Sequence, residues 1–164
     1  MTSIIKVDQI QNAAGGTPTA ADLGLNVSGS VLQVKSSVVK SNILTTSTSN
    51  VSTGLSVSYT PLYSTSTLVI TLEGGRFWCS TSGQQLNLDL YKDGASVTGG
   101  IWTAIYSNGT MHVPNYQRWE EAASTTSART YEVYFNSSSG YGMYLNEASV
   151  GRIPISLVVY EIAG

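Results

Sequence analysis

Hydrophobic and polar residues alternate with a period of two from about residue 30 to the end of the chain. Successive side chains of a strand point to opposite faces, so this alternation predicts strands that bury one face. The apolar positions that repeat in this way are Leu32 and Val34; Leu55, Val57 and Tyr59; Leu68, Ile70 and Leu72; Leu86, Leu88 and Leu90; and Tyr131, Val133 and Phe135. Including shorter runs, we expect roughly eight to ten strands at spacings of about 8–14 residues.

Turn residues separate these runs. Asp93-Gly94 and Asn108-Gly109 are dipeptides favoured in two-residue hairpin turns, and Gly74-Gly75 follows another apolar run. A periodicity of 3.6 residues is not sustained over ten residues anywhere, and the one helix candidate is a single turn at residues 19–24. We therefore predict an all-β fold, an antiparallel β-sandwich or jelly roll.

In the last stretch of the chain, both sets of alternating positions are apolar, so both faces of a strand there would be apolar. Ile155, Leu157 and Val159 alternate with Val158 and Tyr160. A strand with two apolar faces lies centrally in a sheet or faces a partner. We expect this closing strand to contact the core on one side and another surface on the other.

Charge is scarce in this sequence. Charged residues make up 11% and the formal net charge is −2, whereas soluble domains average roughly 25% charged residues. This charge balance gives no basic footprint, so sequence-independent binding of nucleic acid is not expected. No apolar run reaches the roughly 18 residues that span a bilayer, so membrane insertion is not expected. The opening "MTSIIKVDQI" has neither the basic nor the apolar part of a secretory signal, so we expect the chain to begin in a cytoplasm.

Residues that could perform catalysis are few. Cys79 is the single cysteine, expected as a buried free thiol, and His112 is the single histidine, through which any Ser-His-Asp relay would have to run. Glu120 and Glu121 are adjacent, so on a strand their carboxylates would point to opposite faces. No motif places a nucleophile in a special turn. We predict a non-enzymatic protein with no catalytic residues, no metal and no cofactor.

One region, "GGIWTAIYSNGTMHVPNYQRWEE", is rich in aromatic residues. Aromatic rings with polar edges suit surfaces that stack on sugars or contact proteins. The candidates for receptor contact are Trp102, Tyr106, His112 and Tyr116. The alternative is that this region forms the core of two paired strands, with Trp102 the most buried and Tyr116 the most exposed member.

Residues 1–29 contain a double glycine, a Pro-Thr turn and a few apolar residues. These apolar residues are too few to fold alone, so we expect them to bury against another chain. The predicted anchoring residues are Ile4, Ile5, Val7, Ile10, Leu23 and Leu25. This divides the chain into an attachment segment, 1–29, and a β-sandwich domain, 30–164.

The opening "IKVDQIQNAAGGTPTAADLGLNVSGSVLQV" resembles that of small virion fibre and tail proteins of marine and freshwater tailed bacteriophages. In that family, an I-K-V-D-x-I-Q start, a Gly-Gly-x-Pro-Thr turn and a Gly-Ser-Val-Leu-Gln-Val strand introduce a β-rich domain. The stretches "TGLSVSYTPLYSTSTLVITLEGG", "RTYEVYFNSSSGYGMYLN" and "SLVVYEIAG" are similar to strands of that domain. The resemblance covers nearly the whole chain.

This resemblance implies a homotrimeric virion protein, assembled in the host cytoplasm, with a jelly-roll domain similar in outline to tumour-necrosis-factor-like trimers. The implied partners are other virion proteins of the tail, baseplate or capsid, and a host glycan or outer-membrane component. The residues leave the position open between a tail fibre or tail tip and a capsid decoration, head fibre or baseplate adaptor. A free carbohydrate-binding β-sandwich is a further alternative, and it predicts a monomer.

Overall fold

The computed structural model describes residues 11, 14–18, 23, 27–97, 102–107, 112–146 and 153–164, and for 102–105, 107 and 112–115 it describes the backbone alone. The described residues form strands and connecting loops. The strands are β1 (Val31–Val39), β2 (Ile43–Thr45), β3 (Val51–Tyr59), β4 (Thr67–Cys79), β5 (Gln84–Lys92), β6 (Ala95–Ser96), β7 (Trp102–Ser107), β8 (His112–Ala122), β9 (Arg129–Ser137), β10 (Met143–Leu145) and β11 (Ile155–Ile162). The predicted helical turn at 19–24 has only residue 23 among the described positions, and the Asn108-Gly109 turn lies outside them.

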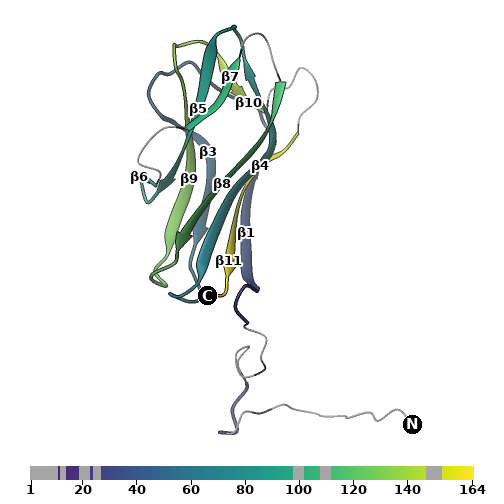
Figure 1. The fold of residues 1–164 in the computed structure, drawn as a ribbon, viewed down its shortest axis with the longest axis vertical. Helices are drawn as coiled ribbons and strands as arrows, with labels where there is room; N and C mark the ends of the chain where they lie inside the picture. Colours follow the sequence, from purple (N-terminus) through teal and green to yellow (C-terminus); the bar gives the residue numbers. More distant parts are fainter. Residues whose placement is uncertain are drawn as a thin grey trace, which may run out of the picture.

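The eight longer strands form two antiparallel sheets that pack face to face (Figure 1). One sheet has the order β1-β11-β4-β8 and the other β3-β9-β5-β7. The chain therefore crosses between the sheets in the sequence of an eight-stranded jelly roll. The short strand β10 pairs with the last residues of β4, past the part of β4 that pairs with β11, and β2 pairs with β10; β6 pairs with the end of β5. The predicted all-β jelly roll is confirmed.

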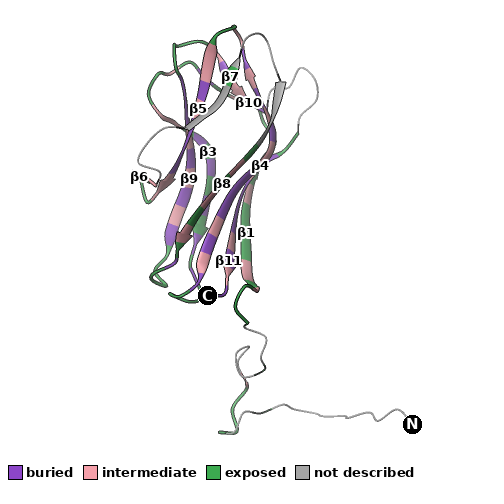
Figure 2. Ribbon diagram, in the orientation of Figure 1, coloured by how far each residue is buried: buried purple, intermediate pink, exposed green. Residues whose placement is uncertain are grey.

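The core lies between the two sheets and follows the predicted alternation, visible as bands of buried and less buried residues along the strands (Figure 2). Predicted core residues that are at most 5% exposed are Leu55, Val57, Tyr59, Leu68, Ile70, Leu72, Leu86, Leu88, Leu90, Tyr131, Val133 and Phe135. The Cys79 thiol is also buried, which raises its pKa. Val34 was expected in the same core, and that expectation is wrong. It is 50% exposed, because the register of β1 places it opposite Tyr160 on the outer side of the sheet.

The Gly74-Gly75 pair was expected to separate two strands, but it does not end a strand. Gly74 and Gly75, both with positive φ, form a bulge inside β4. Below it β4 pairs with β11, and above it with β10. A Cβ atom on Gly74 would lie 2.4 Å from the Pro154 carbonyl oxygen, so this close approach requires glycine. The predicted Asp93-Gly94 turn does join β5 to β6, with φ of 51° and 83° at these residues.

The closing strand β11 lies between β1 and β4, as its two apolar faces predicted. The residues just before β1 are fastened to the end of the chain. Gly29 donates its N–H to the Ala163 carbonyl, and Ala163 donates to the Ser30 carbonyl, both at 2.8 Å. The domain thus begins beside its own C-terminus, at one end of the sandwich (Figure 1).

Candidate interaction surfaces

The outer side of the β1-β11-β4-β8 sheet carries valines among serines and threonines, and Val158 lies between Ser36 and Thr71. We call it the valine face and define it by Val34, Val38, Val69, Val158 and Tyr160. Val34 and Val38 are 50% and 49% exposed on β1, while Val158 lies at the centre of the sheet and is 8% exposed. Register aligns Val34, Tyr160 and Val69 in one row across three strands. An apolar sheet surface of this kind is typical of contact with another protein surface.

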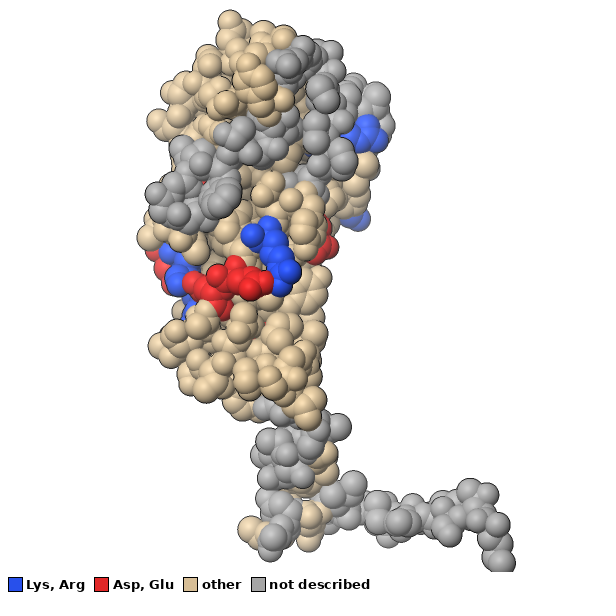
Figure 3. Space-filling model, viewed as in Figure 1, with Lys and Arg blue, Asp and Glu red and all other residues tan. Residues whose placement is uncertain are grey.

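Charges on the same side lie on the edge strand β8 and, at Glu73, on the neighbouring strand β4. Arg118 and Glu120 form an exposed ion pair on β8, and Glu73 accepts a hydrogen bond from Thr71 at 2.6 Å. In Figure 3, several charged side chains lie in a band across the middle of the sandwich, and the described surface directly below this band is uncharged. The valine face therefore combines an uncharged centre with a charged border.

The outer side of the β3-β9-β5-β7 sheet is polar. We call it the tyrosine–asparagine face. It is defined by Asn50, Ser52, Asn87, Asp89, Tyr91, Glu132, Tyr134 and Asn136. Asn136 donates to Asn50 at 2.6 Å and accepts from Asn87 at 2.9 Å. The Asn50 amide in turn lies 3.1 Å from the Tyr91 hydroxyl and 3.4 Å from Asp89. Side chains from β5, from β9 and from Asn50, the residue just before β3, are thereby joined in one hydrogen-bonded network.

Two tyrosines of this face stack on each other. The rings of Tyr91 and Tyr134 have centroids 4.1 Å apart and planes inclined by 28°. Both side chains are half-buried, and the neighbouring outward positions of β3 are the small residues Ser52, Gly54 and Ser56. Serine and glycine are too short to cover an aromatic ring, so the pair stands above its surroundings.

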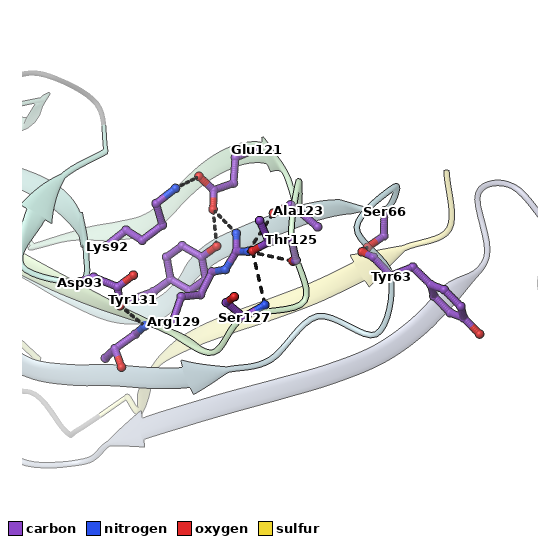
Figure 4. Close-up of polar contacts among 11 residues, drawn as sticks. Tyr63, Ser66, Lys92, Asp93, Glu121, Ala123, Thr125, Ser127, Arg129 and Tyr131 are labelled. Atoms are coloured by element: carbon purple, nitrogen blue, oxygen red, sulfur yellow. Dashed lines mark hydrogen bonds and ion pairs between the residues drawn. The ribbon is translucent and has the colours of Figure 1, made fainter.

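A separate polar cluster joins the two sheets from the inside, around Glu121 of β8 (Figure 4). The Glu121 carboxylate accepts from Lys92 at 2.7 Å, from Arg129 at 3.2 Å and from the Tyr131 hydroxyl. Burial alone would raise the pKa of Glu121, but these hydrogen bonds and the nearby cations lower it below its ordinary value. Arg129 is 8% exposed and also donates to the carbonyls of Ala123 and Thr125. The cluster ties β8 of one sheet to β5 and β9 of the other.

A hollow of about 280 Å³ adjoins this cluster, between the Asp93-Gly94 turn and the loop after β8. Its polar lining residues are Lys92, Asp93, Ser124, Thr125, Ser127 and Arg129. Lys92 and Arg129 are both engaged with Glu121, and Asp93 accepts from the Thr130 N–H at 2.8 Å. The lining groups therefore hold the loop and the hairpin in place.

The predicted receptor-contact residues do not form a single surface. Tyr106, 58% exposed, lies opposite Gln85 on the outer side of the β3-β9-β5-β7 sheet. Tyr116, 62% exposed as expected, lies opposite Glu73 on the outer side of the other sheet. The structure describes the backbone of Trp102 and His112, in β7 and β8, and not their side chains. Their role in receptor contact stays a prediction.

Of the predicted anchoring residues, Leu23 is described and is 47% exposed. The others lie outside the described residues: Ile4, Ile5, Val7, Ile10 and Leu25. The division at residues 29 and 30 stays a prediction, and β1 begins at Val31. Glu120 and Glu121 do point to opposite sides of the sheet, which confirms that they are not a carboxylate pair.

Sequence reasoning missed Tyr91 and Tyr134. The apolar positions of these strands were used to predict the core, and the positions between them were not considered. In β5 those positions are Asn87, Asp89 and Tyr91, which alternate with buried leucines. Their pairing with β9 depends on which strands become neighbours, and the alternation does not encode that. Within the described residues, no group of three or more His, Cys, Asp or Glu side chains is placed to hold a metal ion. In the same residues, no helix has the length and hydropathy needed to cross a membrane.

Neither a protein-family model nor a curated protein matches the sequence. Among solved structures, the VP2 subviral particle of infectious bursal disease virus is similar with a TM-score of 0.44 and 14% identity, over 82% of this chain and 39% of that one. The dimeric latent PorU of Porphyromonas gingivalis is similar with a TM-score of 0.36 and 10% identity, over 84% of this chain and 14% of that one. The structure of the Gx strain of infectious bursal disease virus is similar with a TM-score of 0.35 and 14% identity, over 98% of this chain and 42% of that one. The chain thus spans less than half the length of each, and likeness this distant identifies no family.

Proposed function

We propose that this protein is a non-enzymatic structural component of a bacteriophage virion. In this proposal it is a homotrimeric tail fibre or tail-tip protein, attached through residues 1–29, whose β-domain contacts the host surface. The resemblance of the opening motif and of the strand sequences supports the family, and the jelly-roll topology fits it. The observation that supports self-association is the valine face, and the number of three copies follows from the resemblance alone.

A covering partner would stabilise the valine face, because Val34 and Val38 are about half exposed to water in the single chain. Burying apolar surface contributes about 25 cal/mol per Å². Closed symmetric assembly of identical chains is the usual way to bury such a surface. The centre of the face, at Val158 and Thr71, holds no charged side chain that would oppose contact between copies.

Light scattering of the purified full chain at micromolar concentration tests the assembly. We expect a mass three times the 17.4 kDa of one chain. The Val158→Lys substitution is expected to yield monomers, because it places a charge at the centre of the buried face. The matched control, Ser56→Lys, adds the same charge to the exposed outer side of the other sheet and should leave the trimer intact. A monomeric wild-type chain would instead support the free carbohydrate-binding sandwich, for which the polar tyrosine–asparagine face provides a reason.

The position on the virion separates the two structural alternatives. Electron microscopy of intact particles, with the protein labelled by an antibody fragment, should show density at the tail or its tip. Density on the capsid surface or at head vertices would support a decoration or head-fibre role. Density at the baseplate would support an adaptor.

The attachment role of residues 1–29 has its own test. We expect a chain lacking residues 1–28 to fold and to form the same oligomer, because every β-strand of the described residues begins after this segment. The truncated chain should be absent from purified particles, as measured by immunoblotting beside the full-length chain. Incorporation of the truncated chain at full-length levels would contradict attachment through this segment, whereas loss of the oligomer would place assembly contacts within it.

A further inference from the structure

We propose that the tyrosine–asparagine face is a binding site for a neutral glycan, with the stacked Tyr91 and Tyr134 rings as its platform. As the site of host contact, it rests on the virion function proposed above and specifies where and by what chemistry that contact is made. The site lies on the sheet rather than among the aromatic residues predicted from the sequence, apart from Tyr106 at its β7 end.

The platform is the first argument. Sugar rings have apolar C–H surfaces that pack on aromatic rings, and tyrosine adds a polar edge without much conformational entropy. The Tyr91 and Tyr134 rings hold each other in position at 4.1 Å. The residues of β3 beside them, Ser52 and Ser56, have short side chains, and the Ser52 hydroxyl donates to the Glu132 carboxylate.

The second argument is the set of hydrogen-bonding groups around the platform. Amide and carboxylate side chains are the groups that pair with sugar hydroxyls, since each provides a donor or acceptor in a fixed plane. Asn50 and Asn136 hold each other at 2.6 Å, and Asp89 accepts from Ser96 at 2.9 Å. Asp89 and Asn136 are nearly inaccessible, at 1% and 2% exposure, so they fix the orientation of the more exposed groups. A rigid polar frame lowers the entropy cost of binding.

Charge decides the class of glycan. Among the outward-facing described positions of β3, β5 and β9, the ionisable groups include two carboxylates, Asp89 and Glu132, and no lysine or arginine. An anionic sugar would be repelled by these carboxylates and would find no cation there. A neutral hexose or N-acetylhexosamine chain has no such penalty. The polar groups of this face disfavour contact with an apolar protein surface. Such a surface would instead pack on the valine face, on the opposite side of the sandwich.

Saturation-transfer NMR with the full-length chain tests the site. The probes are the neutral oligosaccharides chitohexaose, maltohexaose and cellohexaose, with polysialic acid as the anionic comparison. We expect at least one neutral probe to bind and polysialic acid not to bind. Tyr134→Ser should weaken that binding by about tenfold or more, because it removes half of the platform. Tyr134→Phe keeps the ring and should retain most of the affinity.

Tyr116→Ser is the matched control, because it removes an exposed tyrosine from the opposite sheet and should leave binding unchanged. Binding of polysialic acid alone, binding that Tyr134→Ser does not alter, or no binding by any neutral probe would overturn the inference. The mass measurement separates this result from the proposed function. A trimer that binds none of the sugars would support the proposed virion role and contradict the glycan site. A monomer that binds them would support the glycan site and contradict the trimeric virion role.

Discussion

Replacing Glu161 by glutamine is expected to destabilise the domain by about 2–4 kcal/mol. Glu161 is 0% exposed, and its carboxylate accepts hydrogen bonds from five groups. These donors are the Gln33 amide, the Tyr59 and Ser66 hydroxyls, and the backbone N–H groups of Leu62 and Tyr63. An amide has one acceptor oxygen, and its NH₂ group would face donors. The loop after β3 would lose the anchor that fastens it to β11.

The same carboxylate predicts a loss of stability in acid. Burial alone would raise the pKa of Glu161, but hydrogen bonds from Ser66, Leu62, Gln33 and Tyr63 lower it from 4.5 to about 2. Because the folded pKa lies below the unfolded one, the stabilisation is present above pH 4.5 and is lost as the pH falls toward 2. A shift of this size corresponds to about 3 kcal/mol.

Urea unfolding at pH 7, 5, 4 and 3 measures both effects. The wild-type chain should exceed Glu161→Gln in stability at pH 7, and the difference should shrink as the pH falls, because glutamine does not titrate in this range. Glu73→Gln, a half-buried carboxylate on the outer side of the same sheet, should change stability by less than about 1 kcal/mol. A wild-type advantage over Glu161→Gln that stays constant down to pH 3 would contradict the role assigned to the ionised carboxylate.

The core of this protein is readable from its sequence because burial in a sandwich repeats every two residues. Leu86, Leu88 and Leu90 face the core for that reason alone, and so do Tyr131 and Val133. Gly74 limits this kind of reading. A glycine marks either a strand end or a bulge, and the choice depends on the Pro154 carbonyl that approaches it from a distant part of the chain.

The candidate surfaces are less readable, because they depend on which strands become neighbours. Tyr91 and Tyr134 are 43 positions apart in sequence, and antiparallel pairing of β5 with β9 brings their rings together. Glu161 reaches the N–H groups of Leu62 and Tyr63 across 99 and 98 positions. The sequence placed Tyr106 and Tyr116 on either side of one turn, but β7 and β8 belong to different sheets. Proximity in sequence therefore misleads where the chain crosses from one sheet to the other.

The two outer faces divide the chemistry of the molecule. The valine face has the uncharged centre that association between identical chains requires, whereas the tyrosine–asparagine face has polar groups already held by one another. Because the faces lie on opposite sides of one sandwich, a trimer that buries the first leaves the second exposed. This arrangement is the reason that the proposed assembly and the proposed glycan site are compatible in one chain.

Glu120 and Glu121 provide the sharpest comparison of two adjacent residues in this protein. We expect Glu121→Gln to cost about 2–4 kcal/mol, because Arg129 is buried and would lose its counter-charge while Lys92 and Tyr131 would lose an anionic acceptor. Glu120→Gln should cost less than about 1 kcal/mol, because its partner Arg118 is exposed to water.

Urea unfolding at pH 7 compares these two variants directly, and hydrogen exchange of residues 123–129 shows where the loss acts. Exchange in this loop should accelerate in Glu121→Gln and not in Glu120→Gln, since Arg129 holds the carbonyls of Ala123 and Thr125. Equal costs for the two substitutions would mean that the inward carboxylate does not tie the sheets together. Because the two residues share strand, charge and size, the expected difference comes from their burial and from the partners that each carboxylate binds.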